Sequence, residues 1–579
     1  MKSTRTIQMA CATLSLALAS LMLVPSLAYS QARKMSEDLE RPSAKQFVNV
    51  IVQYRVAPAQ SHIDRIQQRG GSLRRDLRSM KSGAFRVPVD AVAALANDPD
   101  VAYVSPDRPL RAATYSNNPD FYEQAVFAQS SWNSYDGSGI GIAVIDSGIT
   151  NNGDFGTRIV YSQSFVTGQT ATTDAYGHGT HVAGILAGGG TKSTGSNFSR
   201  TFLGVANNAK IINLRALDQN GSGTDSAVIA AIQKAIQLKS TYNIRIINLS
   251  LGRGVYESYA LDPLCQAVEA AWKAGIVVVV AAGNDGRNNA AGTNGYGTID
   301  APANDPYVIT VGAMKPVGTP DRADDLIASY SSKGPTLFDH VVKPDIVAPG
   351  NQVISTLSST TATLYSSANS IPTNYYDNGG TNAASNVYFK LNGTSMAAPV
   401  VSGTAALLLQ KNSALTPDQI KARLMKSAYK NFPRTSVATD PVTGNTYTSQ
   451  YDIFTVGAGY LDIQNAMQST DLAPSTVGAA SSPAVAVDSS GNIYLVGGTS
   501  VVWGTSVVWG TSVVWGTSVV WGTNTSGQSV VWGSSVVWGT GGTQAYNALW
   551  GSSAAWGASV VWGTSSPSQA NAIAINGEK

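Results

Sequence analysis

Two histidines lie three residues apart in the stretch YGHGTHVAGI, which begins at Tyr176. Such a pair can ligate a metal ion, or one imidazole can act as a general base. A zinc site would need a third ligand, and the surrounding sequence has no HExxH motif or cysteine cluster. His178 lies between glycines that leave room for a substrate, whereas His181 falls inside the following helical pattern. This placement favours His178 as a base.

A serine that could use such a base lies in NGTSMAAPVVSGTAALLLQ. A long helical pattern begins near Ser395, and Thr394 is expected to cap it. Free amides and the helix dipole at this place favour negative charge, which attack by a serine on a carbonyl group creates. Because serine is a poor nucleophile until a base removes its proton, the combination predicts nucleophilic catalysis.

Three near-continuous apolar runs of the sequence end in polar or turn-forming residues. The run ends are Asp146 after GIAVI, Ser250, Leu251 and Gly252 after NIRIINL, and Asn284 after GIVVVVAAG. Parallel strands open their carboxyl ends on one edge of the sheet, where ligands bind. A carboxylate, a backbone rim and an amide donor would then face one crevice. Asp146 is expected to orient the imidazole and to stabilise its cation.

The elements that must position these groups extend from about Ser116 to Thr470. Apolar runs rich in β-branched residues alternate there with helical patterns such as DSAVIAAIQKAIQL. Strands that are apolar on both faces predict an α/β domain whose mainly parallel sheet is covered by helices on both faces. Residues from about Phe47 to Leu110 follow the order β-α-β-α-β, which predicts a small α+β module. The polar stretch from Thr356 to Lys390 is expected to form a long surface loop.

The chain resembles the subtilisin-like serine proteases, or subtilases, in the motifs VIDSGI, GHGTHVAG, AAGN and GTSMAAP. The resemblance covers about residues 116–470. It implies a triad in which Asp146 orients His178 as the base and Ser395 is the nucleophile that forms an acyl-enzyme. It also implies that Asn284 supplies the oxyanion hole. Two segments would bind the substrate backbone: Gly221, Ser222 and Gly223, and Ser250, Leu251 and Gly252.

Residues 46–112 are similar to the propeptide of this family, which implies an intramolecular inhibitor and a zymogen. Autocleavage is then expected between Asp107 and Asn118. The alternative is an ordinary N-terminal domain that stays attached. The substrates implied by the resemblance are proteins and peptides, and we expect broad specificity. Asp285 follows Asn284 where the family's pocket for the side chain before the cut bond begins. It either favours basic or polar side chains there or caps a turn.

The triad chemistry requires no cofactor, but structural calcium is common in the family. Asp154 stands where a subtilisin calcium ligand would be. The loop after the His178 helix departs from the family pattern. A calcium site and an ordinary surface loop are both open alternatives here.

Residues 1–28 are typical of a secretory signal, because basic residues precede an apolar run from Met9 to Leu23 and small residues lead to Ala28. We therefore expect a secreted protein, extracellular or associated with the cell surface. The formal net charge is +3 without a long basic run, so the sequence does not point to a nucleic-acid partner.

Residues 471–579 form a low-complexity tail that carries nine of the eleven tryptophans. The hexad SVVWGT repeats from Ser500. An even period keeps the tryptophans of a strand on one face, so the hexads could stack as a solenoid or short-strand array. Self-association through strand pairing, attachment to a surface and an export-related appendage are alternatives. A second class of function is therefore an adhesive or self-assembling surface protein whose enzyme domain is inactive or only processes the chain.

Overall fold

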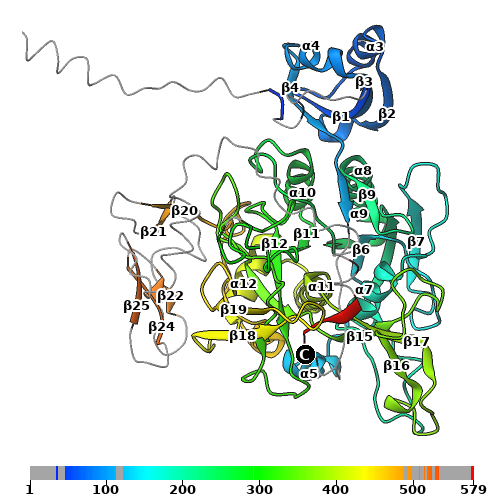
Figure 1. The fold of residues 1–579 in the computed structure, drawn as a ribbon, viewed down its shortest axis with the longest axis vertical. Helices are drawn as coiled ribbons and strands as arrows, with labels where there is room; N and C mark the ends of the chain where they lie inside the picture. Colours follow the sequence, from blue (N-terminus) through cyan, green and yellow to red (C-terminus); the bar gives the residue numbers. More distant parts are fainter. Residues whose placement is uncertain are drawn as a thin grey trace, which may run out of the picture.

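The computed structural model describes residues 34–36, 39, 46–111, 122–290 and 292–487, short strand segments between 493 and 533, and residues 571 and 575–578. The predicted signal segment and the side chains of the tryptophan repeats lie outside the described residues. Figure 1 shows a small N-terminal module, in blue, on top of a larger domain.

The N-terminal module is a four-stranded antiparallel sheet of order β2-β3-β1-β4. Its elements are β1 (Phe47–Tyr54), α3 (Gln60–Gln68), β2 (Ser72–Leu77), η1 (Arg78–Met80), β3 (Ser82–Pro88), η2 (Val89–Ala91), α4 (Val92–Ala96) and β4 (Val101–Pro106). Apolar residues of both helices pack with β1, β3 and β4 in one core cluster. The sequence predicts α+β correctly but misses β2, whose segment SLRRDL is largely polar and has only Leu77 buried.

The larger domain is built on an eight-stranded sheet of order β13-β12-β11-β10-β6-β8-β7, with β14 paired to β12. All pairings are parallel except β12 with β13. The three apolar runs quoted above are confirmed as strands β6 (Gly141–Asp146), β10 (Ile244–Leu249) and β11 (Val277–Ala281). Two further buried strands are β8 (Lys210–Arg215) and β12 (Ile309–Lys315). The remaining strands are β7 (Ile159–Ser164), β13 (Leu326–Ile327) and β14 (Ile346–Pro349).

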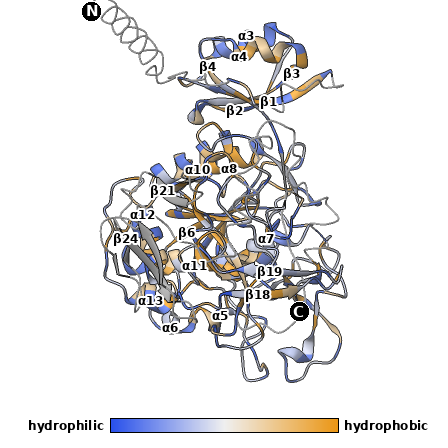
Figure 2. Ribbon diagram, turned by 60° about the vertical axis from the view of Figure 1, so that its left-hand side comes forward, coloured by the Kyte–Doolittle hydropathy of each residue, from blue (hydrophilic) through white to orange (hydrophobic). Residues whose placement is uncertain are grey.

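Helices cover this sheet in two groups. In the first group, α7 (His178–Ala187) and α11 (Thr394–Lys411) contact each other and the central strands. In the second group, α8 (Asp225–Gln237) contacts α10 (Pro263–Lys273) and the same sheet. Figure 2 shows α11 as largely hydrophobic at the centre of the domain, and its residues are buried from Thr394 to Leu409. This central helix carries the predicted nucleophile.

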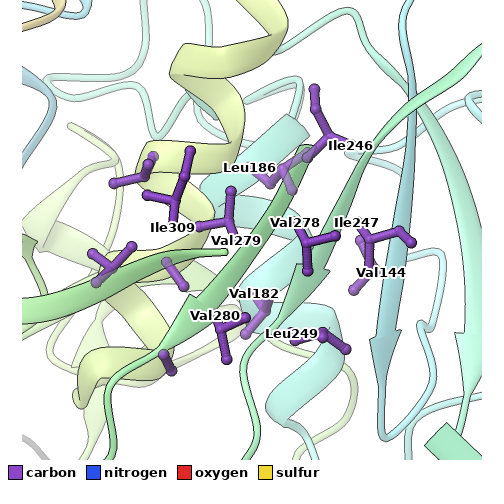
Figure 3. Close-up of a cluster of buried hydrophobic side chains, with 14 of the residues drawn as sticks. Val144, Val182, Leu186, Ile246, Ile247, Leu249, Val278, Val279, Val280 and Ile309 are labelled. Atoms are coloured by element: carbon purple, nitrogen blue, oxygen red, sulfur yellow. The ribbon is translucent and has the colours of Figure 1, made fainter. Parts of the chain in front are cut away.

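The core between α7 and the sheet is shown in Figure 3. Val182 and Leu186 of α7 lie in one cluster with Val144 of β6 and Val280 of β11, and all four side chains are at most 1% exposed. Full burial of such a side chain contributes roughly 1.5–3 kcal/mol. The start of α7 is therefore held firmly against the end of β6.

The expectation of a long surface loop from Thr356 to Lys390 is wrong. That region contributes to a three-stranded antiparallel sheet of β15 (Val353–Thr356), β16 (Ser370–Pro372) and β17 (Ala384–Leu391), with η3 (Thr373–Tyr375) between the last two strands. Tyr376 and Tyr388 are buried there in a small core with Phe202 and Ile354. A few well-placed aromatic residues outweigh the polar composition of the segment.

Short elements complete the domain: β9 (Ser222–Thr224), α5 (Tyr122–Ala125), α6 (Gln129–Trp132), α9 (Lys239–Tyr242), α12 (Pro417–Ser427), α13 (Ile463–Gln468), β18 (Thr435–Thr439) and β19 (Thr446–Gln450). Among the described residues, no helix is both long and apolar enough to cross a membrane.

Short antiparallel strands follow in the tail, as its β-prone composition predicts. A two-stranded sheet is formed by β20 (Ala484–Val487) and β21 (Ile493–Val496). The repeats form a second sheet from β22 (Val507–Val508), β23 (Val514–Trp515), β24 (Ser518–Thr523) and β25 (Ser529–Gly533). In its register Val519 lies opposite Trp532, and Trp521 lies opposite Val530.

Candidate active site

Asp146 and His178 meet where β6 ends and α7 begins. His178 Nδ1 lies 2.7 Å from Asp146 Oδ1, and both side chains are at most 1% exposed. The backbone N–H of Ser147 donates to the same carboxylate oxygen at 2.7 Å. On the other side of the ring, His178 Nε2 is buried and has no hydrogen-bond partner among the described residues. The contact with Asp146 thus fixes the ring and leaves Nε2 available.

The start of α7 is capped by Asp174, a residue that the sequence motifs do not single out. Its carboxylate accepts the N–H groups of Gly177 at 2.7 Å and Thr180 at 2.8 Å, and the Ser147 hydroxyl at 2.8 Å. Burial nevertheless raises the pKa of Asp174. The signal that could have found it is an acidic residue just before a helix, where free amides need acceptors.

Gly179, in the first turn of α7, permits the close approach of α7 to β6. A Cβ atom there would contact the Gly148 carbonyl oxygen and would lie 3.1 Å from Asp146 Oδ1. No larger residue fits this position unless the two segments move apart.

His181 is a core residue and does not face the crevice with His178. Its Nε2 lies 2.9 Å from the Val353 carbonyl oxygen, and its ring packs edge-on against Phe389. Burial lowers the pKa of His181 to about 3, so the ring is neutral at ordinary pH. No group of three or more His, Cys, Asp or Glu side chains in the described part of the chain is arranged to hold a metal ion. The choice of His178 over its neighbour therefore agrees with the geometry.

Ser395 is the second residue of α11, and its hydroxyl donates to the Ser250 carbonyl at 3.1 Å. In return, the Ser250 hydroxyl donates to the Ser395 carbonyl at 2.8 Å. Behind this pair, Asn248 donates to the Ser250 hydroxyl and accepts from Ser402 of α11. The end of β10 therefore holds the first turns of α11 in place through buried polar contacts.

The expectation that Thr394 caps α11 is wrong, because the helix begins after Gly393 without a side-chain cap. Instead, the Thr394 backbone N–H donates to Asn284 Oδ1 at 2.9 Å, and the Thr394 hydroxyl lies 3.2 Å from the same oxygen. The free backbone N–H at this helix start is therefore bonded by Asn284, which follows strand β11 and is distant in sequence. No local sequence pattern predicts this contact.

These contacts orient Asn284, which follows β11. Because Oδ1 accepts from Thr394, the amide nitrogen Nδ2 must point to the other side. Nδ2 is buried and has no partner among the described residues, and Asn284 is 7% exposed. A buried amide N–H without an acceptor is costly, so such a group marks a place for a ligand atom. The Ser395 N–H, in the first turn of α11, can serve the same acceptor.

Of the two segments predicted to bind the substrate backbone, the first is paired with a strand from the N-terminal module. At the first, β9 pairs antiparallel with β5 (Pro109–Arg111). In this register Leu110 lies opposite Gly223 and Arg111 lies opposite Ser222. Gly221 has φ 69°, and a Cβ atom there would lie 2.5 Å from the Tyr176 ring. At the second, Leu251 is buried between Ser250 and Gly252.

Two carboxylates lie next to Asn284, and only that of Asp285 is adjacent in sequence. Asp285 directly follows Asn284, whereas Asp300 comes from an irregular segment and is near only in space. A Cβ atom on Gly252 would lie 2.9 Å from Asp300, and one on Gly283 would lie 2.6 Å from its carboxylate. Burial raises the pKa of Asp285 to about 6, and burial with the nearby Asp285 raises that of Asp300 well above its usual range.

The surroundings of Asp154 do not fit a calcium site. One carboxylate oxygen accepts from the Thr191 hydroxyl at 2.7 Å and the Lys192 N–H at 3.0 Å. The other accepts from the Tyr388 hydroxyl at 2.5 Å. Calcium binds six to eight oxygen ligands, and here hydrogen-bond donors of the protein take the carboxylate instead. Asp154 therefore joins the loop after α7 to β17.

Comparison with known proteins agrees with this geometry. Residues 137–459 match the family described as the subtilase family. The chain is 38% identical over 300 residues to serine protease AprX of Bacillus subtilis (strain 168), over 51% of this chain and 62% of AprX. It thus spans less than two thirds of that relative. It is 34% identical over 368 residues to subtilisin E of the same strain, over 63% of this chain and 80% of subtilisin E.

Among solved structures, the fold is similar to fervidolysin from Fervidobacterium pennivorans, a keratinolytic enzyme related to subtilisin. The TM-score is 0.56 at 22% identity, over 80% of this chain and 66% of that chain. This likeness concerns the fold, while the family follows from the sequence matches. The chain belongs to the subtilase family of serine-type peptidases.

Proposed function

We propose that the protein is a secreted serine endopeptidase, made as a zymogen, that uses Asp146, His178 and Ser395 as its triad. The observation that carries the proposal is a pair of buried nitrogen atoms, His178 Nε2 and Asn284 Nδ2, that have no partner among the described residues. One can take a proton and the other can donate to an oxyanion. Membership of the subtilase family supports the same roles.

In this mechanism, Ser395 Oγ attacks the carbonyl carbon of the scissile bond while His178 Nε2 takes the hydroxyl proton. Asp146 stabilises the resulting imidazolium. The oxyanion accepts from Asn284 Nδ2 and from the Ser395 N–H. His178 then protonates the leaving amine as the C–N bond breaks. Water, deprotonated by the same histidine, hydrolyses the acyl-enzyme and restores the serine.

The N-terminal module is proposed to inhibit the enzyme before cleavage. Its exit strand β5 pairs with β9, at the segment expected to bind substrate. Arg108 forms a two-pronged ion pair with Glu257 at 2.6 Å for each bond, and both side chains are at most 5% exposed. Asp107 accepts from the backbone N–H of Ser226 at the start of α8. These contacts support an intramolecular complex in which the residues after Arg111 lead to the cleavage point.

The pocket for the side chain before the cut bond is proposed to prefer lysine and arginine. The structure shows no hydrogen bond or ion pair from a described residue to the side-chain carboxylate of Asp285 or Asp300, although their backbone groups are bonded. Arg253, whose charge acts on Asp300, already pairs with Asp225 at 2.9 Å and Asp262 at 2.8 Å. A basic side chain of the substrate would supply the missing positive charge. This is narrower than the broad specificity expected from the sequence.

A second proposal concerns the tail, for which attachment to a surface or self-association is retained. The repeats form a sheet of short antiparallel strands, and strand edges can pair with another chain. Deletion of residues 497–570, which keeps the buried contacts of Ser482 with Asp345 and Lys421, is expected to leave peptidase activity intact and to reduce retention on cells. Unchanged retention would remove this role.

The central test compares the wild-type chain with Ser395→Ala. Both are secreted, purified and incubated with casein, with and without a covalent serine-directed inhibitor. We expect casein cleavage only by the uninhibited wild type, and retention of residues 46–112 in the variant. Mass spectrometry of the secreted forms gives both mature ends. If Ser395→Ala matures and digests casein at the wild-type rate, the proposed function is wrong.

A further inference from the structure

Glu578 lies in a buried pocket of the catalytic domain, far in sequence from everything it touches. It is 1% exposed, and its Oε1 accepts from Arg287 Nη2 at 2.9 Å and from the Ser329 N–H at 2.8 Å. The Ser329 hydroxyl donates to the same oxygen. These are charge-assisted bonds to a fully covered carboxylate, which are the stronger class of hydrogen bond.

The pocket is held in shape by residues of the domain itself. Arg287 also pairs with Asp440 at 3.1 Å and donates from Nε to the Ser329 hydroxyl at 2.9 Å. Its side chain is 9% exposed. Lys315, which is 7% exposed, adds a second cationic group. Burial lowers the pKa of Lys315, and the negative charge of Glu578 partly opposes this shift. A preformed cationic pocket of this kind suits a carboxylate on a peptide.

The pocket borders the catalytic groups. The backbone carbonyl of Glu578 accepts from Gln352 Nε2 at 2.8 Å and from Asn351 Nδ2 at 3.3 Å. The Gln352 backbone N–H in turn donates to the side chain of Asn392, which lies three residues before Ser395. Arg287 lies three residues after Asn284. Glu578 therefore contacts Arg287 in the loop after Asn284, and it is linked through Gln352 to Asn392 before the nucleophile.

The other end of the same segment lies near the base. Tyr176 donates its hydroxyl to Asn571 Oδ1 at 2.8 Å, and the Tyr176 ring lies 6.2 Å from that of His178. Tyr176 also lies against Gly221, at the start of the segment expected to bind substrate. Figure 1 shows the red end of the chain alongside α7. Asn571 thus contacts a neighbour of the base, whereas Glu578 contacts Gln352, which bonds to Asn392 close to the nucleophile.

We propose that Asn571 and residues 575–578 act as an intramolecular ligand of the catalytic cleft, with Glu578 in an anion-binding subsite formed by Arg287 and Ser329. The segment excludes peptide substrates while it is docked, and it does so independently of the N-terminal module. The subsite takes the side-chain carboxylate of a peptide. This inference rests on the proposed peptidase function, but the pocket itself can be tested without catalysis.

Covalent attachment favours the docked state, because a tethered ligand is present at a high effective concentration. A modest affinity for the free peptide is therefore enough to keep the cleft covered. When the segment is removed from the chain, this high effective concentration is lost and the cleft is uncovered. The device differs from β5, which pairs with β9 and comes from the opposite end of the chain.

The binding test uses the Ser395→Ala chain without residues 571–579, so that no peptide is digested. The probe is the synthetic peptide NAIAINGE, labelled with a fluorophore at its N-terminus and followed by anisotropy. Saturable binding is expected, and a peptide with glutamine in place of glutamate should bind about 30-fold more weakly. Equal affinities of the two peptides, or no saturable binding at millimolar concentration, would overturn the subsite.

The activity test measures how fast a fluorophosphonate labels the full mature chain, the chain without residues 571–579, and Glu578→Gln. The deletion is expected to react about tenfold faster, with Glu578→Gln shifted in the same direction. Glu269→Gln is the matched control, because Glu269 pairs with Lys273 on α10 away from the pocket, and it should react like the full chain. Equal rates for the deletion and the full chain would overturn the inference. If no chain reacts, the proposed function fails, and peptide binding still decides the subsite.

Discussion

The Ser395 hydroxyl donates to the Ser250 carbonyl oxygen at 3.1 Å, and His178 Nε2 lies without a hydrogen bond on the described part of the chain. The nucleophile is thus in a resting rotamer. Rotation about its Cα–Cβ bond, which needs no movement of α11, re-aims the hydroxyl. Substrate or a transition-state analogue is the expected trigger, since catalytic hydrogen bonds often tighten only in the complex.

Substitution of Asp146 by asparagine should lower kcat by about 10⁴-fold, because the amide cannot hold the reactive tautomer of His178 or stabilise its cation. KM for a peptide substrate should change little. Steady-state kinetics on a chromogenic peptide checks both values. Asp321→Asn, at an exposed position, serves as the control for loss of a carboxylate. A fall in kcat of less than tenfold for Asp146→Asn would contradict the assigned role.

Substitution of Asn284 by alanine should reduce kcat by ~10²–10³-fold, since one oxyanion donor is lost. The same change removes the acceptor for Thr394, so thermal unfolding must be measured in parallel. Asn284→Asp retains the acceptor oxygen but not the donor. If that variant keeps wild-type kcat with normal stability, Asn284 does not stabilise the oxyanion.

Cleavage after arginine should depend on pH more steeply than cleavage after phenylalanine. The pKa of Asp285 is raised to about 6, so below this pH the carboxyl group is protonated and attracts a basic side chain weakly. As the pH rises through 6, the charge appears and the ratio of kcat/KM for arginine over phenylalanine should increase.

Asp300→Asn should lower this ratio about tenfold or more, because a partly buried carboxylate facing a cation is lost. The two substrates differ only in the residue before the cut bond, arginine or phenylalanine. The pH dependence that comes from His178 is the same for both and cancels in the ratio. A ratio that is independent of pH and unchanged in Asp300→Asn would show that neither carboxylate forms the pocket.

Arg108→Ala should loosen the N-terminal module, because it leaves Glu257 buried without its partner. Loss of one member of a buried ion pair costs about 3–5 kcal/mol. Faster release of residues 46–112 after cleavage is expected, measured by native gel or size exclusion over time. Adding Glu257→Gln to Arg108→Ala should restore part of the loss. Arg74→Ala, on the same module, is the control. Unchanged release in Arg108→Ala would refute the role of the pair.

Long apolar runs made the central sheet predictable, because a strand buried on both faces must be apolar throughout. The strands β2 and β17 could not be predicted from apolar runs. The first is polar along most of its length, and the second is held by a few tyrosines that meet Phe202 only in the folded chain. Tertiary contact rather than local pattern determines both.

The triad and Asn284 could be proposed from sequence because each follows a recognisable strand or precedes a helix. Asp174 and Asp300 act through side chains brought near by irregular segments, and Thr394 exchanges a capping role for a contact with Asn284. Glu578 was out of reach for the same reason, since its partners lie more than two hundred residues away in sequence.

Gly179 has a wider consequence for how this catalytic centre can vary. Gly179 has only a hydrogen atom where other residues have a side chain, so the turn after β6 and the first turn of α7 are in direct contact. This contact fixes the distance between Asp146 and His178. A side chain at position 179 would push α7 away from the turn after β6, and it would therefore change the positions of Asp146 and His178 together. Engineering that seeks to shift the acidity of the imidazole must therefore change residues on the Nε2 side of the ring, and it must leave the contact between Gly179 and Gly148 unchanged.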